Sequence, residues 1–93
     1  MKSVAVRLHY PGSSITVEQA FGKVLRKRRI HLKISQESLA QDSDLDRTYV
    51  SLLERGQRQP SLRTIIKLCR TLKIPPDQII KEVVVFLNEN PAH

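Results

Sequence analysis

The stretch Gln36–Arg55, QESLAQDSDLDRTYVSLLER, predicts two short helices joined by a tight turn, the second over about 46–55. Ser35 stands where an N-cap belongs before the first helix, and Asp46 stands there before the second. An apolar residue precedes each cap and another follows four positions after it, which is the spacing of a hydrophobic staple. Two capped helices separated only by Ser43–Leu45 cannot lie parallel. They must cross steeply, as in a helix-turn-helix.

The second of these helices has an inward and an outward side. Its outward side carries Arg47, Ser51 and Arg55 at i, i+4 and i+8, flanked by Thr48 and Leu52. Two arginines, two hydroxyl groups and an exposed leucine suit the base edges of a DNA major groove. An ordinary solvated helix face is the alternative that this stripe alone leaves open.

The chain resembles the Cro/C1-type, or XRE, family of helix-turn-helix regulators in RRIHLKISQESLA (28–40) and LDRTYVSLLERGQRQPSL (45–62). The second run is especially similar to the controller proteins of restriction–modification systems. The likeness extends over residues 21–80 and implies an all-α, five-helix, lambda-repressor-like DNA-binding domain. Two residues depart from the family pattern, since Ser43 replaces a hydrophobic residue and Asp44 replaces the usual glycine. Aspartate tolerates a left-handed backbone better than most residues, so the turn is expected to persist.

The resemblance also implies roles for individual residues. It implies that the second helix of the motif, over about 46–55, is the recognition helix, which enters the major groove of DNA. It also implies that Arg29, at the end of the first helix, pairs with Glu54, at the end of the recognition helix. The residues expected to contact bases are Arg47, Thr48 and Leu52. The residues expected to contact the DNA backbone are Gln36, Tyr49, Ser51, Arg55, Arg58 and Ser61. A free surface charge is the alternative for Arg58.

The remaining helices are predicted from caps and apolar periodicity. We expect a helix from Val17 to Leu32 capped by Thr16, and another over 62–72 capped by Ser61. Gly56 should end the recognition helix as a left-handed C-cap. The predicted organisation is an N-terminal arm over 1–14, flexible or strand-like, then a helix-turn-helix domain over 15–87 with its motif at 36–55, and a frayed tail over 88–93.

The last element carries more apolar surface than one small domain needs to cover. It is predicted as a helix, although Val83–Phe86 also has strand character. This surface predicts a homodimer that binds a two-fold symmetric operator. The expected interface residues are Ile79, Ile80, Val83, Val84, Phe86 and Leu87. The alternative is an antitoxin or another protein-interaction module whose apolar C-terminal segment binds a partner protein.

The charge is concentrated in the predicted folded region. The chain has 93 residues and a formal net charge of +7, and Lys23–Lys73 holds thirteen Lys or Arg against five acids, a net of +8. Such a basic domain favours a polyanionic partner, here double-stranded DNA. A membrane surface is a weaker alternative, because no basic amphipathic helix with bulky aromatic residues is present. A core of this size would gain from dimerisation.

No catalytic or metal-binding pattern is present in the sequence. The three histidines are scattered, and the single cysteine, Cys69, cannot build a zinc site or an internal disulfide. Cys69 falls on the apolar stripe of a predicted helix and is expected to be buried. We therefore expect no enzyme activity, no cofactor, no metal and no small-molecule ligand. No apolar run is long enough for a signal peptide or a membrane span, so a cytoplasmic protein is expected.

Overall fold

The computed structural model describes residues 12–91, and this part of the chain is all-α. Apart from an isolated bridge between Ser13 and Pro91, it contains no β-pairing. Its five helices are α1 (Val17–His31), α2 (Gln36–Asp42), α3 (Arg47–Glu54), α4 (Leu62–Leu72) and α5 (Pro76–Asn88). The predicted five-helix architecture is confirmed. Residues 1–11, which hold most of the predicted arm, lie outside the described residues.

Side-chain caps start four of the helices where the sequence predicts them. Thr16 forms a capping box with Gln19, with backbone-to-side-chain distances of 2.9 and 3.1 Å. Ser35, Asp46 and Ser61 accept bonds of 3.0, 2.7 and 3.1 Å from the backbone N–H groups of Ser38, Thr48 and Thr64, in that order. Each such cap stabilises a helix by about 1 kcal/mol. No side chain caps α5, which begins at Pro76 after Pro75.

A left-handed residue lies in each of the four connections between the helices. Gly56 has a φ of 71°, as expected after the recognition helix. Asp44 has a φ of 56°, so aspartate does adopt the conformation for which the family uses glycine. Lys33 and Lys73 have φ values of 60° and 57°. A side chain in this region costs about 1–2 kcal/mol, so packing of the helices on either side must hold both lysines there.

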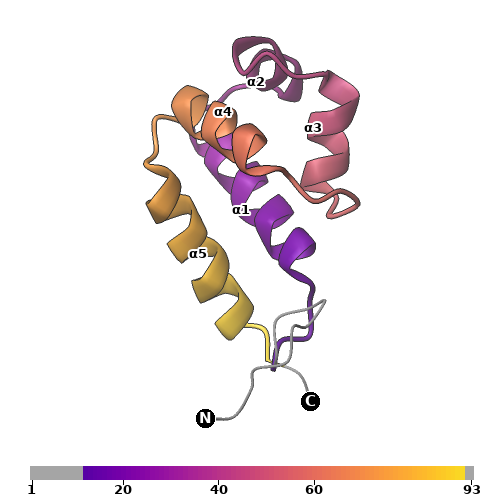
Figure 1. The fold of residues 1–93 in the computed structure, drawn as a ribbon, viewed down its shortest axis with the longest axis vertical. Helices are drawn as coiled ribbons and strands as arrows, with labels where there is room; N and C mark the ends of the chain where they lie inside the picture. The colour runs from indigo at the N-terminus through magenta and orange to yellow at the C-terminus, as the bar shows by residue number, and fades with distance from the viewer. Residues whose placement is uncertain (1–11, 92–93) are drawn as a thin grey trace.

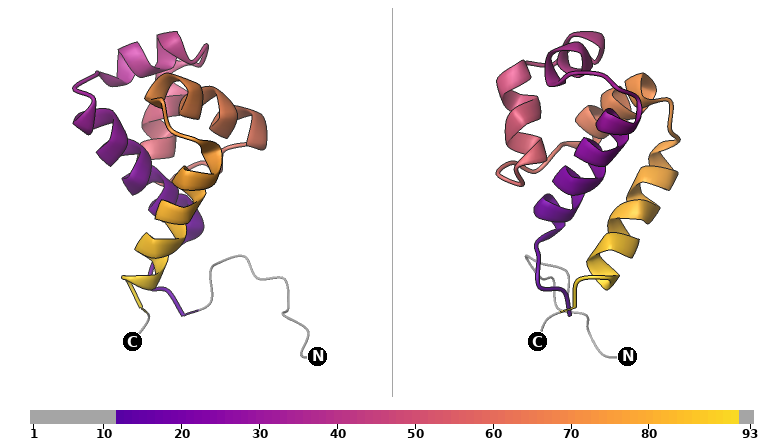
Figure 2. Two further views of the ribbon diagram at one scale, coloured as in Figure 1. Left: turned by 90° about the vertical axis from the view of Figure 1, so that its left-hand side faces the viewer. Right: turned by 180° about the vertical axis from the view of Figure 1, so that it is seen from behind.

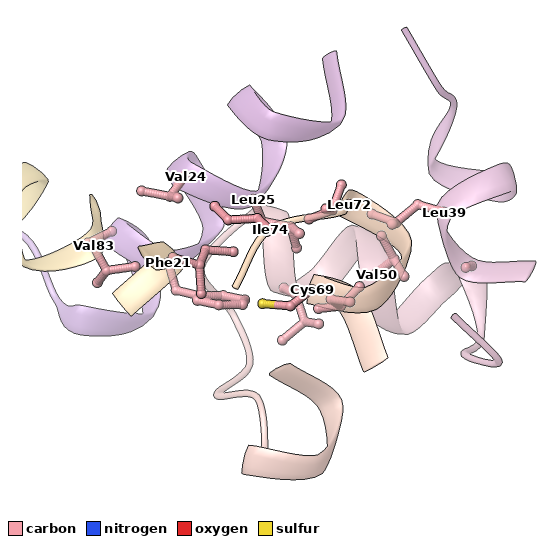
Figure 3. Packing of buried hydrophobic residues seen from close by; sticks show 14 of the residues in the cluster. Phe21, Val24, Leu25, Leu39, Val50, Cys69, Leu72, Ile74 and Val83 are labelled. Carbon is pink, nitrogen blue, oxygen red and sulfur yellow. The ribbon is translucent and has the colours of Figure 1, made fainter. Parts of the chain in front are cut away.

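α1 lies at the centre of the fold, with α3 on one side and α5 on the other (Figures 1 and 2). α2 packs on α3 and α4, and α4 also contacts α5. Apolar side chains from all five helices meet in one core (Figure 3). Its largest fully buried members are Leu25, Leu39, Leu53, Leu68, Ile79, Leu87, Val50 and Cys69. Cys69 is buried, as expected, and burial raises the pKa of its thiol.

α5 is helical throughout, including Val83–Phe86, the run that also has strand character in the sequence. The helical geometry decides which of the predicted dimer residues are exposed. Ile79, Val83 and Leu87 are 0%, 4% and 2% exposed, because α5 turns them into the core against α1. The sequence predicts these three residues at the dimer interface, whereas in this fold they belong to the core of a single chain. Ile80 remains 44% exposed, and Val84 is half-buried.

Hydrogen bonds of Asn90 connect the two ends of the described chain. The carbonyl of Asn90 accepts bonds from Ser14 N at 2.7 Å and from the hydroxyls of Ser13 and Ser14, both at 3.1 Å. The side-chain amide of Asn90 donates to Phe86 O at 2.8 Å. These bonds join the segment before α1 to the segment after α5. Asn90 belongs to the tail predicted to fray over 88–93, of which residues 92–93 lie outside the described residues.

Within residues 12–91, no helix is both long enough and apolar enough to cross a membrane.

Candidate nucleic-acid interface

The turn between α2 and α3 is fixed by a buried serine. Ser43 is 3% exposed, and its hydroxyl donates to Thr71 Oγ1 on α4 at 2.7 Å. A hydroxyl can replace the family's hydrophobic residue here because this partner satisfies it. Leu45 N donates to Ala40 O at 2.8 Å, which closes the turn. The crossing of the two helices is thus set by contacts that involve α4.

An ion pair holds the end of α3 against α1. Arg29 Nε lies 2.6 Å from Glu54 Oε2, and its Nη2 lies 3.0 Å from Glu54 Oε1. A third nitrogen, Nη1, donates to the carbonyl of Ile34 at 2.9 Å. The hydrogen bond to Glu54 raises the pKa of the Arg29 guanidinium above its ordinary value. The side chains are only 12% and 2% exposed, so water screens this pair weakly.

Gln36 joins the same cluster from the start of α2. Its Nε2 donates to Glu54 Oε1 at 3.0 Å. The sequence predicts a phosphate contact for Gln36, and an amide nitrogen has two N–H groups. One is directed at Glu54, which leaves the other for a phosphate. The cluster therefore ties the first turn of α2 to the last turn of α3 through a single carboxylate.

The predicted base-contacting residues lie on the outer side of α3. Arg47 and Thr48 are exposed, and Leu52 is half-buried. Within residues 12–91, Arg47 forms no ion pair, and the same holds for Arg58 in the loop after α3. Both guanidinium groups are therefore available to a ligand outside the described fold. α3 itself lies on the outside of the molecule, away from α5 (Figure 1).

The predicted backbone-contacting residues differ in how far the fold already engages them. Tyr49 is half-buried against the core, and its hydroxyl lies 3.4 Å from Thr64 Oγ1. The Ser61 hydroxyl caps α4 and also lies 3.0 Å from Thr64 Oγ1. Arg55 is exposed and Ser51 half-buried, with a long contact of 3.4 Å from Arg55 Nε to Ser51 O. Tyr49 on α3 and Ser61 at the start of α4 thus both contact the Thr64 hydroxyl, which links the two helices.

Gly22 is a positioning residue that sequence reasoning missed. A Cβ at this position of α1 would lie 2.5 Å from Leu53 O and 2.6 Å from Glu54 O. Both atoms belong to the backbone of α3, so they cannot move aside as a flexible side chain would. A glycine in the middle of a helix is otherwise unfavourable, and that was the signal in the sequence. The recognition helix therefore rests directly on the backbone of α1.

The second ion pair, also missed, links α1 to α5. Arg28 Nε donates to Glu82 Oε1 at 3.0 Å, and a second guanidinium nitrogen contacts the other carboxylate oxygen. The bond to Arg28 lowers the pKa of the Glu82 carboxyl below its ordinary value, and it raises the pKa of Arg28. This pair is more exposed than the first, at 34% and 26% of the side chains.

The described residues do not assemble a metal site. No group of three or more His, Cys, Asp or Glu side chains gathers within 12–91 in a way that could hold an ion.

Comparison with known proteins identifies the class to which this fold and its outer helix belong. A family model described as Helix-turn-helix (HTH_3) matches residues 25–79, which is more than half of the 93-residue chain. The chain therefore belongs to the helix-turn-helix family.

Its relatives include controllers of restriction–modification systems. The control protein C.BamHI of Bacillus amyloliquefaciens is 41% identical over 61 residues, covering 64% of this chain and 75% of that protein. The control protein C.MunI of a Mycoplasma species is 39% identical over 64 residues, covering 68% and 86%. The crystal structure of the controller protein C.AhdI from Aeromonas hydrophila matches with a TM-score of 0.65 and 47% identity, covering 67% and 94%. The predicted resemblance to controller proteins is confirmed.

Proposed function

We propose that the protein is a transcriptional regulator of the restriction–modification controller type, which binds double-stranded DNA in the cytoplasm at a specific operator. The observation that carries this proposal is the presentation of α3. Its outer side exposes Arg47 and Thr48, while its other end is fixed to α1 and α2 through Glu54. A helix held this rigidly can place side chains against base edges in a major groove.

In this proposal, some residues contact the DNA bases and others bind the DNA backbone and so position the protein. Arg47 and Thr48 in the first turn of α3 contact bases, and Leu52 packs against a thymine methyl group. Arg58 lies beyond the helix and binds phosphate. The remaining proposed backbone contacts come from Gln36, Tyr49, Ser51, Arg55 and the start of α4 at Ser61. Tyr49 and Ser61 already bond within the fold, so their contribution is mainly to orient neighbouring donors.

The regulator acts as a homodimer in this proposal, and the structure narrows the surface available for it. Ile80 and Val84 follow the buried Ile79 and Val83 by one position, which turns them about 100° away around α5. On the adjacent helix α4, Leu62 and Ile66 are 73% and 44% exposed, one turn apart. We propose that the interface uses Ile80 and Val84 of the predicted set, with Leu62 and Ile66 as further exposed apolar candidates. Phe86 packs partly against the protomer core instead.

Selection of bound fragments from random DNA tests the proposal as a whole. We expect one enriched motif with two inverted half-sites, centred about 34 Å apart if each α3 enters successive turns of the groove. Enrichment of no motif would contradict sequence-specific binding. Enrichment of a single half-site would contradict the dimer and leave the readout by α3 intact.

A further inference from the structure

A groove between α1 and α5 has no role in the DNA-binding proposal. It has a volume of about 630 Å³, and its lining residues come from α1, from α5 and from Glu89 just after α5. Val24, Val85 and Phe86 give it an apolar floor. Val85 is 48% exposed, on the same helix whose Ile79, Val83 and Leu87 are buried in the core.

The rim of this groove is cationic. Lys23 and Lys27 line it from α1, and Lys81 lines it from α5; all three are exposed. A fourth cation, Arg28, is bonded to Glu82 across the groove. With Glu89 as the other acid, four cations stand against two carboxylates. Because Arg28 is paired with Glu82, the three lysines face Glu89 alone, and the rim keeps a net positive charge around apolar side chains.

We propose that this groove binds a short acidic segment of a partner protein, one that places apolar side chains on Val85 and Phe86 and carboxylates beside the three lysines. Charge complementarity across such a rim steers the encounter and fixes orientation, and the apolar floor provides the area to bury. The combination distinguishes this surface from that of α3, which offers arginine and hydroxyl groups around a single leucine.

Other occupants fit the charge less well. The segment 1–11 of this chain, MKSVAVRLHYP, contains Lys2 and Arg7 and no acid, so the lysine rim would repel it. A second copy carries the same net charge of +7 and the same basic groove. DNA would satisfy the lysines, but its phosphates would leave the apolar floor uncovered.

The two flanks of α5 are distinct, so the groove can work beside the proposed dimer. Glu82 and Phe86 precede the buried Val83 and Leu87 by one position, whereas Ile80 and Val84 follow buried residues by one position. One position turns the helix by about 100°, so the two sets lie on opposite flanks. A partner in the groove therefore leaves Ile80 exposed for a second copy.

Fluorescence anisotropy with two labelled peptides tests the proposal on the full-length protein. The probe is EELEELLEE, and the matched control peptide EESEESSEE has the same charge without the leucines. We expect tighter binding of the leucine peptide. We expect Lys27→Glu with Lys81→Glu to weaken it about tenfold, since each reversal removes an attraction and adds a repulsion. Val85→Glu should also weaken binding of the leucine peptide, because it places a carboxylate in the apolar floor of the groove.

Arg26→Glu with Arg70→Glu is the control double variant, since it makes the same change of charge at exposed positions outside the groove. It should weaken binding less than about twofold, by screened long-range charge alone. Equal losses in the two double variants would overturn the proposal, because binding would then follow net charge. Equal affinity for the two peptides would also overturn it. So would amide shifts on peptide addition confined to α3, which would place the peptide on the proposed DNA surface.

Discussion

Arg29 and Glu54 meet at two points, 2.6 and 3.0 Å apart, and so lock the last turn of the recognition helix to the first helix. The Glu54 side chain is 2% exposed, so its charge depends on this partner and on Gln36. Removing one member of a buried pair leaves the other charge in a poor solvent. We expect Arg29→Ala and Glu54→Ala each to lower the free energy of unfolding by about 3 kcal/mol.

The double variant distinguishes a direct interaction from two independent losses. We expect Arg29→Ala with Glu54→Ala to cost clearly less than the sum of the single changes, as measured by urea unfolding. Gln36→Ala is the matched control, because it removes a neutral donor to the same carboxylate and should cost less than Arg29→Ala. Strictly additive losses would show that the two charges do not stabilise one another.

Gly22 tests how closely α3 must approach α1. We expect Gly22→Ala to destabilise the protein by about 1–3 kcal/mol, because the added methyl group would overlap the backbone of Leu53 and Glu54. The intrinsic helix preference of alanine favours the opposite result, by about 0.5–1 kcal/mol. Lys23→Ala, one residue on and exposed, is the control and should change thermal unfolding little. A stabilised Gly22→Ala variant would show that the helices can separate at no cost.

Local signals in the sequence were enough to predict the caps, the turns and the outer side of α3. Thr16, Ser35, Asp46 and Ser61 act on the backbone within three residues, so their roles can be read without knowing the fold. Ile79 and Ile80 could not be separated in this way. Both fall on the broad apolar side of α5, and only its packing against α1 decides which one is buried.

Long-range contacts explain the other differences between prediction and structure. The carbonyl of Asn90 is bonded to Ser13 and Ser14, more than seventy positions earlier in the chain. No periodicity near Asn88 could show that the tail would be held. The Arg28–Glu82 pair spans 54 positions in the same way. Ser43 departs from the family pattern at the turn, and the hydroxyl that accepts its hydrogen bond belongs to Thr71 on another helix.

The Arg28–Glu82 pair predicts a dependence of stability on acid. Its bond to Arg28 lowers the pKa of Glu82 below the ordinary value of 4.5. The pair's contribution is therefore fully present above about pH 4.5, and it is lost as the pH falls through the lowered pKa of the folded state. We expect Glu82→Gln to destabilise the protein at neutral pH by about 0.2–1 kcal/mol, since the pair is partly exposed.

Urea unfolding at a series of pH values measures this contribution. The difference in free energy of unfolding between wild type and Glu82→Gln should become smaller as the pH is lowered below about 4.5. Glu89→Gln is the control, because Glu89 forms no ion pair within 12–91. A difference that stays constant down to low pH would show that Glu82 contributes through packing alone.

The proposed dimer surface predicts which substitutions give a monomer. We expect Ile80→Asp to produce a monomer at micromolar concentration in light scattering, because it places a charge in an apolar interface. Val85→Asp is the matched control on the opposite flank of the same helix, where the wild-type residue is 48% exposed against 44% for Ile80. It should leave the dimer intact. A monomer from Val85→Asp and a dimer from Ile80→Asp would move the interface to the groove between α1 and α5.

Arg47 and Arg58 separate base readout from phosphate binding. Arg47 begins α3, and Arg58 lies in the loop before α4; both are exposed. A guanidinium in the groove can bond guanine O6 and N7 together and discriminate by about 1–3 kcal/mol. We therefore expect Arg47→Ala to relax the preference at one base position in each half-site. Arg58→Ala should weaken binding to all sequences alike and lower the salt slope by about one unit.

Binding to a panel of single-base operator variants at several salt concentrations measures both effects. Lys73→Ala is not a suitable control, because Lys73 has a φ of 57° and alanine there would alter the turn. Arg70→Ala is suitable, since Arg70 is exposed on α4 at a position with ordinary helical geometry. If Arg47→Ala kept every base preference and only flattened the salt slope, Arg47 would be a phosphate ligand. Specificity would then rest on Thr48, Leu52 and the shape of the DNA.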